Sequence, residues 1–93
     1  MPGPIEQAIV ARLTAALAPE ALTVSNDSAR HHGHAGDDGS GESHFSVVVT
    51  SAAFAGQSRV ERQRMVNRAL GELLTDNHIH ALAIKALAPG ETA

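Results

Sequence analysis

The stretch Thr75–Pro89, TDNHIHALAIKALAP, decides the fold because it follows a long helical pattern and is itself not helical. Its apolar run from Ile79 to Ile84 is interrupted only by His80. The run is short, has a β-branched residue at each end and is followed by an Ala-Pro pair, which favours a strand over a buried helix. We therefore predict the third and last strand over His78–Lys85.

His80 is the one polar side chain in this apolar run. Alternation along a strand puts His80 on the same side as Leu82 and Ile84. At the mouth of a central strand, the sheet fixes the backbone while the imidazole reaches solvent, which suits a ligand or a proton-handling group. The alternative is a partly buried, hydrogen-bonded histidine, and this stretch taken alone favours that interpretation.

The residues upstream of this strand predict one helix and two more strands. Apolar residues recur with helical spacing after Pro4, and Pro19 cannot continue a helix, so we expect an amphipathic helix between these prolines. Polar and apolar residues alternate over Ala21–Ser25 and over His44–Ser51. These two segments are predicted to be the first and second strands.

A second helix precedes the last strand. Ser58 followed by Glu61 has the spacing of a capping box, which predicts a helix from Ser58 to about Leu74. The connector Ala52–Gln57 is expected to hold a short helical turn at most. The residues expected to share one core are Ile9, Leu13, Leu22, Val47, Val66, Leu70 and Leu82.

The order of elements is helix, strand, strand, short turn, helix, strand. The first two strands form an antiparallel hairpin, and the third joins after a helical crossover. This order predicts an α+β fold with the helices packed on one face of a three-stranded mixed sheet. We expect a single domain over residues 1–93, with a long loop over residues 26–43 and a flexible tail over residues 86–93.

The composition excludes several classes of function. The chain has two Phe and neither Trp nor Tyr, so a base-stacking platform for single-stranded nucleic acid is not expected. A net charge of −3 argues against a dominant phosphate-binding surface. The chain has no cysteine, which excludes disulfides, a thiol nucleophile and a cluster held by its own thiolates. With no signal peptide and no membrane-spanning run, we expect a cytoplasmic protein without membrane contact.

The segment Asn26–Ser43, NDSARHHGHAGDDGSGES, has no apolar periodicity and is predicted to be a loop. Long loops in small domains are often functional or disordered. A zinc site made of histidine with Asp37 or Asp38 is conceivable, but neighbouring loop positions define no coordination geometry, so a solvated polar loop is favoured on spacing alone. Four of the six histidines lie in or beside this loop: His31, His32, His34 and His44.

The second predicted helix carries four of the seven basic residues, namely Arg59, Arg62, Arg64 and Arg68. Arg64 and Arg68 share the face opposite the apolar stripe, and Arg62 lies at the edge of that stripe. A solvated helix face is the favoured interpretation of Arg64 and Arg68. The alternative is a patch for phosphate or for an acidic protein partner. No phosphate loop, nucleophile elbow or pair of carboxylates indicates an enzyme.

Together these segments resemble the BolA-like family, in order and over nearly the whole chain. The matching segments are NDS at Asn26–Ser28, SHF at Ser43–Phe45, FAGQSRVERQRMV at Phe54–Val66, IHALAI at Ile79–Ile84 and AP at Ala88–Pro89. The resemblance implies a class II KH-like α+β fold, which agrees with the order of elements above. One departure from the family pattern is Gln63, where many members have histidine.

The resemblance also implies a function, that of a non-enzymatic iron–sulfur adaptor in iron–sulfur trafficking and iron homeostasis. Such proteins pair with a monothiol glutaredoxin and share a [2Fe–2S] cluster with it, with glutathione supplied from the partner's side. His80 falls on the family's characteristic histidine, and His31 falls on its loop histidine, with His34 as a further candidate metal ligand. Without a thiolate, the chain would hold no cluster alone.

A second function implied by the resemblance is that of a DNA-binding, stress-response transcriptional regulator of cell morphology. This function would use the second helix, through the arginines Arg59, Arg62, Arg64 and Arg68. The expected partners are therefore a monothiol glutaredoxin, DNA as the alternative, and a second copy of the chain if the protein forms a homodimer.

Overall fold

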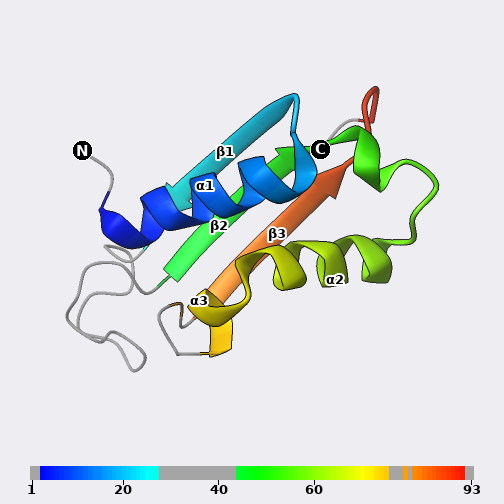
Figure 1. The fold of residues 1–93 in the computed structure, drawn as a ribbon. Coiled ribbons are helices and arrows are strands. Elements are labelled where there is room, and N and C mark those ends of the chain that lie inside the picture. Colours follow the sequence, from blue (N-terminus) through cyan, green and yellow to red (C-terminus); the bar gives the residue numbers. More distant parts are fainter. Residues whose placement is uncertain (1–2, 28–43, 76–78, 80, 92–93) are drawn as a thin grey trace.

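The structure is a computed structural model that describes residues 3–27, 44–75, 79 and 81–91 (Figure 1). Among the helices in these ranges, none is long and apolar enough to cross a membrane. The elements in chain order are α1 (Pro4–Leu17), β1 (Ala21–Asn26), β2 (His44–Thr50), the 3₁₀ turn η2 (Ala52–Phe54), α2 (Arg59–Leu70), α3 (Glu72–Thr75) and β3 (Ala81–Leu87).

The three strands form one mixed sheet in the order β1-β2-β3. β1 pairs antiparallel with β2, and β2 pairs parallel with β3. The helices lie over one face of the sheet, so the predicted α+β architecture is confirmed (Figure 1). Our placement of the third strand at the centre was wrong. The hairpin makes β1 and β2 neighbours, so β3 takes the free side of β2 and is itself an edge strand.

Local sequence explains where the two long helices begin and end. Pro4 opens α1, which ends where Ala18 adopts a left-handed conformation (φ 43°) before Pro19. The Ser58 hydroxyl accepts the Glu61 backbone N–H at 3.1 Å and so caps α2. The predicted single helix to about Leu74 is interrupted at Gly71, whose φ of 48° suits glycine, and α3 follows.

β3 lies further along the chain than predicted. We expected a strand over His78–Lys85 and a flexible tail over residues 86–93, but β3 runs from Ala81 to Leu87. Leu87 pairs with Thr50, and its carbonyl accepts the N–H of Ser51 at 2.9 Å, so pairing with β2 continues past Lys85. The next residue, Ala88, is also buried. Glu91 is held as well, by a hydrogen bond from the Ala88 N–H at 2.9 Å, so the prediction of a loose tail is wrong as far as Glu91.

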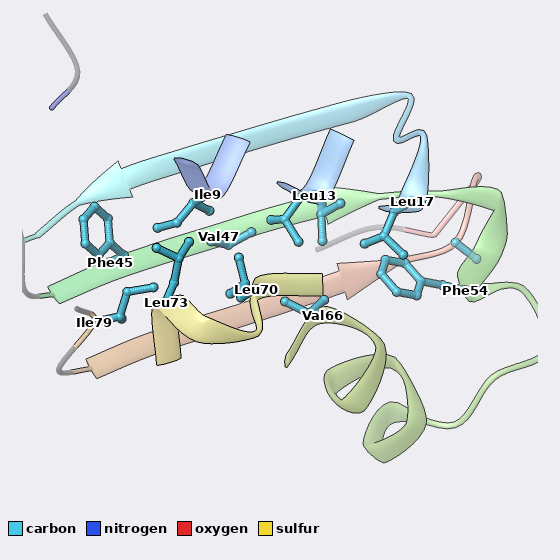
Figure 2. Close-up of a cluster of buried hydrophobic side chains, with 12 residues drawn as sticks. Ile9, Leu13, Leu17, Phe45, Val47, Phe54, Val66, Leu70, Leu73 and Ile79 are labelled. Carbon is cyan, nitrogen blue, oxygen red and sulfur yellow. The ribbon is translucent and has the colours of Figure 1, made fainter. Parts of the chain in front are cut away.

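The core lies between the helices and the sheet, as Figure 2 shows. Every residue predicted to share this core does so, although Leu22 and Leu82 are only partly buried. Phe54 of η2 is also fully buried. The buried hydroxyl of Ser51 donates to the Leu17 carbonyl at 2.6 Å and accepts the Ala53 N–H at 3.1 Å, which joins the end of α1 to the end of β2.

Candidate functional site

The end of β1 and the beginnings of β2 and β3 meet at one end of the sheet. The Asp27 N–H donates to the His44 carbonyl at 2.7 Å, so the two residues that bracket segment 28–43 are hydrogen-bonded neighbours. His44 is also the Cα partner of Ala81, the residue that follows His80 in the chain. Segment 28–43 and His80 therefore attach to the same end of the sheet, which we call the histidine end.

Both chain neighbours of His80 are fixed in place. Ile79 is only 6% exposed, belongs to the core, and donates its backbone N–H to the Leu73 carbonyl at 3.2 Å. Ala81 is held by its pairing with His44. The backbone on each side of His80 is thus anchored, once to α3 and once to β2. Such anchoring is what a ligand-bearing position on a sheet requires.

The loop anchors are fixed in a similar way. The Ser46 hydroxyl donates a hydrogen bond to the Asp27 carboxylate, which ties the last described residue of this side of the loop to β2. His44 is buried, with 7% of its surface exposed, and Phe45 next to it is buried in the core. Sequence reasoning noted His44 at the loop exit but did not identify it as a buried anchor, because its strand position gave no sign of burial.

The predicted metal ligands His31, His34 and His80 lie outside the described residues, so their assignment stays a prediction. Within the described ranges, no group of three or more His, Cys, Asp or Glu residues could hold a metal ion. The observation that bears on a metal site is therefore the attachment of the histidine-bearing segments to one sheet end.

Arg62, predicted to bind nucleic acid or a partner, is engaged within the protein. Its Nε donates to the Gln57 carbonyl at 3.0 Å and its Nη1 to the Ala86 carbonyl at 3.1 Å. Nη1 and Nη2 also bind the two carboxylate oxygens of Glu91 at 2.6 and 3.0 Å. The Arg62 side chain is only 15% exposed. The hydrogen bonds from Arg62 and from the Ala88 N–H lower the pKa of Glu91 from 4.5 to about 2.

Of the other three predicted arginines of α2, Arg59 lines the same groove as Arg62, whereas Arg64 and Arg68 flank Glu61. Arg68 contacts the Glu61 carboxylate at 3.0 Å and Arg64 approaches it at 3.8 Å, and both arginine side chains are largely exposed. Arg59 is exposed and has no ion-pair or hydrogen-bond partner among the described residues. The favoured interpretation of Arg64 and Arg68 as a solvated helix face agrees with this arrangement.

Arg12 of α1 makes two contacts that sequence reasoning missed. Its Nη1 donates to the Leu70 carbonyl at 3.0 Å, and its Nη2 lies 4.0 Å from the Glu72 carboxylate. The guanidinium thus satisfies a carbonyl at the end of α2, where the break at Gly71 leaves the last turn open.

Comparison with known proteins settles the family. The family model described as BolA-like protein matches residues 13–91. The chain belongs to the BolA-like family. It is 47% identical to BolA-like protein 1 of Mus musculus over 96% of this chain, and spans 61% of the mouse protein's length. It is 45% identical to the DNA-binding transcriptional regulator BolA of Vibrio cholerae, with 86% of this chain and 71% of that protein covered.

A solved structure supports the same assignment. The BolA domain of SufE1 from Arabidopsis thaliana superposes with a TM-score of 0.85 at 36% identity and covers 99% of this chain and 100% of that domain. The fold predicted from the resemblance is thereby confirmed as that of a BolA domain.

Proposed function

We propose that this BolA-like protein is a non-enzymatic iron–sulfur adaptor in the cytoplasm. It would present histidine nitrogens to a [2Fe–2S] cluster shared with a monothiol glutaredoxin, which brings its own thiolate and glutathione. The observation that carries this proposal is the shared sheet end. The pairing of His44 with Asp27 on one side and with Ala81 on the other brings the attachment points of both histidine segments together.

The donor set of the chain fits a shared cluster and does not fit one held alone. A [2Fe–2S] cluster normally takes four ligands, mostly thiolates, and histidine can replace some of them. This chain has six histidines and no cysteine. It can therefore contribute one or two nitrogens, and the remaining ligands must come from a partner that carries thiolates. This complementarity is the chemical reason for proposing a glutaredoxin partner.

Within this proposal His80 is the principal ligand, and His31 or His34 supplies the second nitrogen from the loop. The fixed neighbours Ile79 and Ala81 support His80, because a ligand on an anchored backbone loses little conformational freedom on binding. The segment that carries His31 and His34 is anchored where it leaves β1 and where it enters β2, through the hydrogen bond from the Asp27 N–H to the His44 carbonyl.

The experiment that tests the adaptor proposal is anaerobic reconstitution. The protein is mixed with a monothiol glutaredoxin, glutathione, ferrous iron and sulfide, and the complex is isolated by size exclusion. We expect a complex that contains both proteins and two irons, with a visible spectrum that neither protein gives alone. A spectrum identical to that of the glutaredoxin alone, with the two proteins eluting separately, would contradict the proposal.

A DNA-binding regulator is the second candidate function, favoured by the similarity to the Vibrio cholerae protein of that name. The arginines of α2 support it less than the sequence suggested, because Arg62 is bound to Glu91 and two others flank Glu61. Titration of DNA at several salt concentrations tests this candidate. A steep fall of affinity with salt supports phosphate contacts, whereas no measurable binding at low salt contradicts them.

A further inference from the structure

An open groove of about 900 Å³ runs between the first half of α2 and the last half of β3. Its lining includes Gln57, Arg59 and Gln63 on the side of α2 and Lys85 and Glu91 on the side of β3. The strand β3 begins at the histidine end and runs away from it (Figure 1), and its last half, from Ile84 to Leu87, lines the groove. The groove is therefore a surface separate from the proposed cluster site.

A carboxylate of the chain itself already occupies this groove. Glu91 lies in a turn closed by its N–H, which donates to the Ala88 carbonyl at 3.0 Å, and Gly90 takes a φ of 89° there. The carboxylate binds both terminal nitrogens of Arg62 and accepts the Ala88 N–H at 2.9 Å. Glu91 thus behaves as a tethered ligand, held by the forked geometry with which arginine recognises carboxylates.

The guanidinium of Arg62 does not depend on Glu91 for its position. Two backbone carbonyls, those of Gln57 and Ala86, hold it at 3.0 and 3.1 Å. These acceptors orient the fork but carry no net charge. If Glu91 leaves, the arginine remains aimed into the groove with its charge uncompensated, which is the state that attracts another carboxylate.

Two further cations make the groove more positive than one carboxylate can balance. Arg59 and Lys85 line it, and their exposed side chains have no hydrogen-bond or ion-pair partner among the described residues. With Arg62 the groove has three positive side chains against one negative one, on a chain whose net charge is −3. This local excess is complementary to an acidic ligand.

The backbone of β3 adds a second mode of recognition. The Leu87 carbonyl points toward β2, where it accepts the Ser51 N–H. Because backbone groups of successive strand residues point to opposite sides, those of Ile84 and Ala86 face the free edge beside the groove. The Arg62 contact with the Ala86 carbonyl agrees with this direction. Since the Ala86 carbonyl is bound by Arg62, an extended peptide would pair with the Ala86 N–H and with the backbone groups of Ile84 at this edge.

We propose that the groove between α2 and β3 binds an extended acidic peptide segment of a partner protein, and that Glu91 is an internal competitor which this peptide displaces. The peptide's backbone pairs with the free edge of β3, and its carboxylates contact Arg59, Arg62 and Lys85. The proposal is independent of the cluster and of its partner, so it is tested on the apo protein.

The test is fluorescence anisotropy with a short fluorescein-labelled peptide of alternating Glu and Val and the full chain. Glu91→Gln should tighten binding about tenfold, the factor for a groove that Glu91 occupies in roughly nine of ten molecules. Glu72→Gln is the matched control, because Glu72 is 79% exposed, lies near Arg12 and does not line the groove. It makes the same change of charge and should leave the affinity within about twofold of wild type.

Three results would overturn the proposal. Equal effects of the two glutamate substitutions would show that only net charge matters. Equal affinity for a thymidine oligonucleotide of the same charge would show a surface that attracts any polyanion. Unchanged affinity after N-methylation of the peptide at alternate residues would exclude edge pairing. If Glu91→Gln melts below the assay temperature, the double variant Arg59→Ala/Lys85→Ala decides, since it must weaken binding at least about tenfold.

Discussion

Leu70 of α2 is fully buried and points toward Val47 of the sheet, so Leu70→Ala tests the packing of the helices on the sheet directly (Figure 2). Removal of a buried leucine side chain costs about 2–5 kcal/mol, through lost burial and the cavity left behind. A domain of this size has a total stability of roughly 5–14 kcal/mol. The substitution should therefore remove a large part of the free energy of unfolding.

Chemical denaturation followed by far-ultraviolet circular dichroism measures this loss of free energy, and thermal unfolding followed by the same signal measures the melting temperature. For a domain of this size each kcal/mol shifts the melting temperature by about 4–8 °C, so Leu70→Ala should lower it by at least about 8 °C. Val60 on the same helix is 59% exposed, so Val60→Ala is the matched control and should change stability by less than about 0.5 kcal/mol. Equal stabilities of the two variants would show that the face of α2 assigned to the core is wrong.

Three further predictions follow from individual contacts. The pKa of Glu91 is lowered to about 2, so its pair with Arg62 stabilises the fold fully above about pH 4.5 and loses this effect as the pH falls toward 2. The difference in unfolding free energy between wild type and Glu91→Gln should therefore shrink over that pH interval. A difference that stays constant would refute the role of the pair. Ser58→Ala removes the cap of α2 and should lower the free energy of unfolding by about 0.5–2 kcal/mol in the same denaturation assay. Ser58→Gly should lower it by only a few tenths of a kcal/mol, and equal losses for the two variants would argue against a capping role. If DNA is bound through α2, the exposed Arg59 is a better phosphate contact than Arg62, and Arg59→Ala should lower the salt slope of binding by about 1; an unchanged slope would remove Arg59 from that surface.

Local patterns in the sequence predicted most of the fold. The spacing of apolar residues in α1, the capping serine Ser58 and the apolar run around Leu82 each describe neighbours in the chain, so they carry the information for their own element. The boundaries that were missed depend on distant contacts. The helix break at Gly71 follows Leu70, whose carbonyl is bound by Arg12, 58 positions earlier in the sequence. The chain after β3 is held because Glu91 reaches Arg62, which no local pattern reveals.

The candidate site was predicted in part. Alternation singled out His80, but its role as a ligand rests on the family resemblance, and spacing alone favoured a structural histidine. The meeting of the loop and β3 at one end of the sheet needed the register, in which His44 pairs with Ala81. The engagement of Arg62 could not be foreseen, because its acceptors on Ala86 and Glu91 follow it by 24 and 29 residues.

The central claim is that His80 ligates a cluster shared with a glutaredoxin, and His80→Ala tests it most directly. The variant is reconstituted anaerobically with a monothiol glutaredoxin beside wild type and His78→Ala, a control that removes a nearby histidine of the same segment. The account predicts that His80→Ala remains folded by circular dichroism and that the visible spectrum of the shared cluster is lost or changed, while His78→Ala behaves as wild type. The same spectrum and cluster lifetime for His80→Ala and wild type would show that His80 is not a ligand.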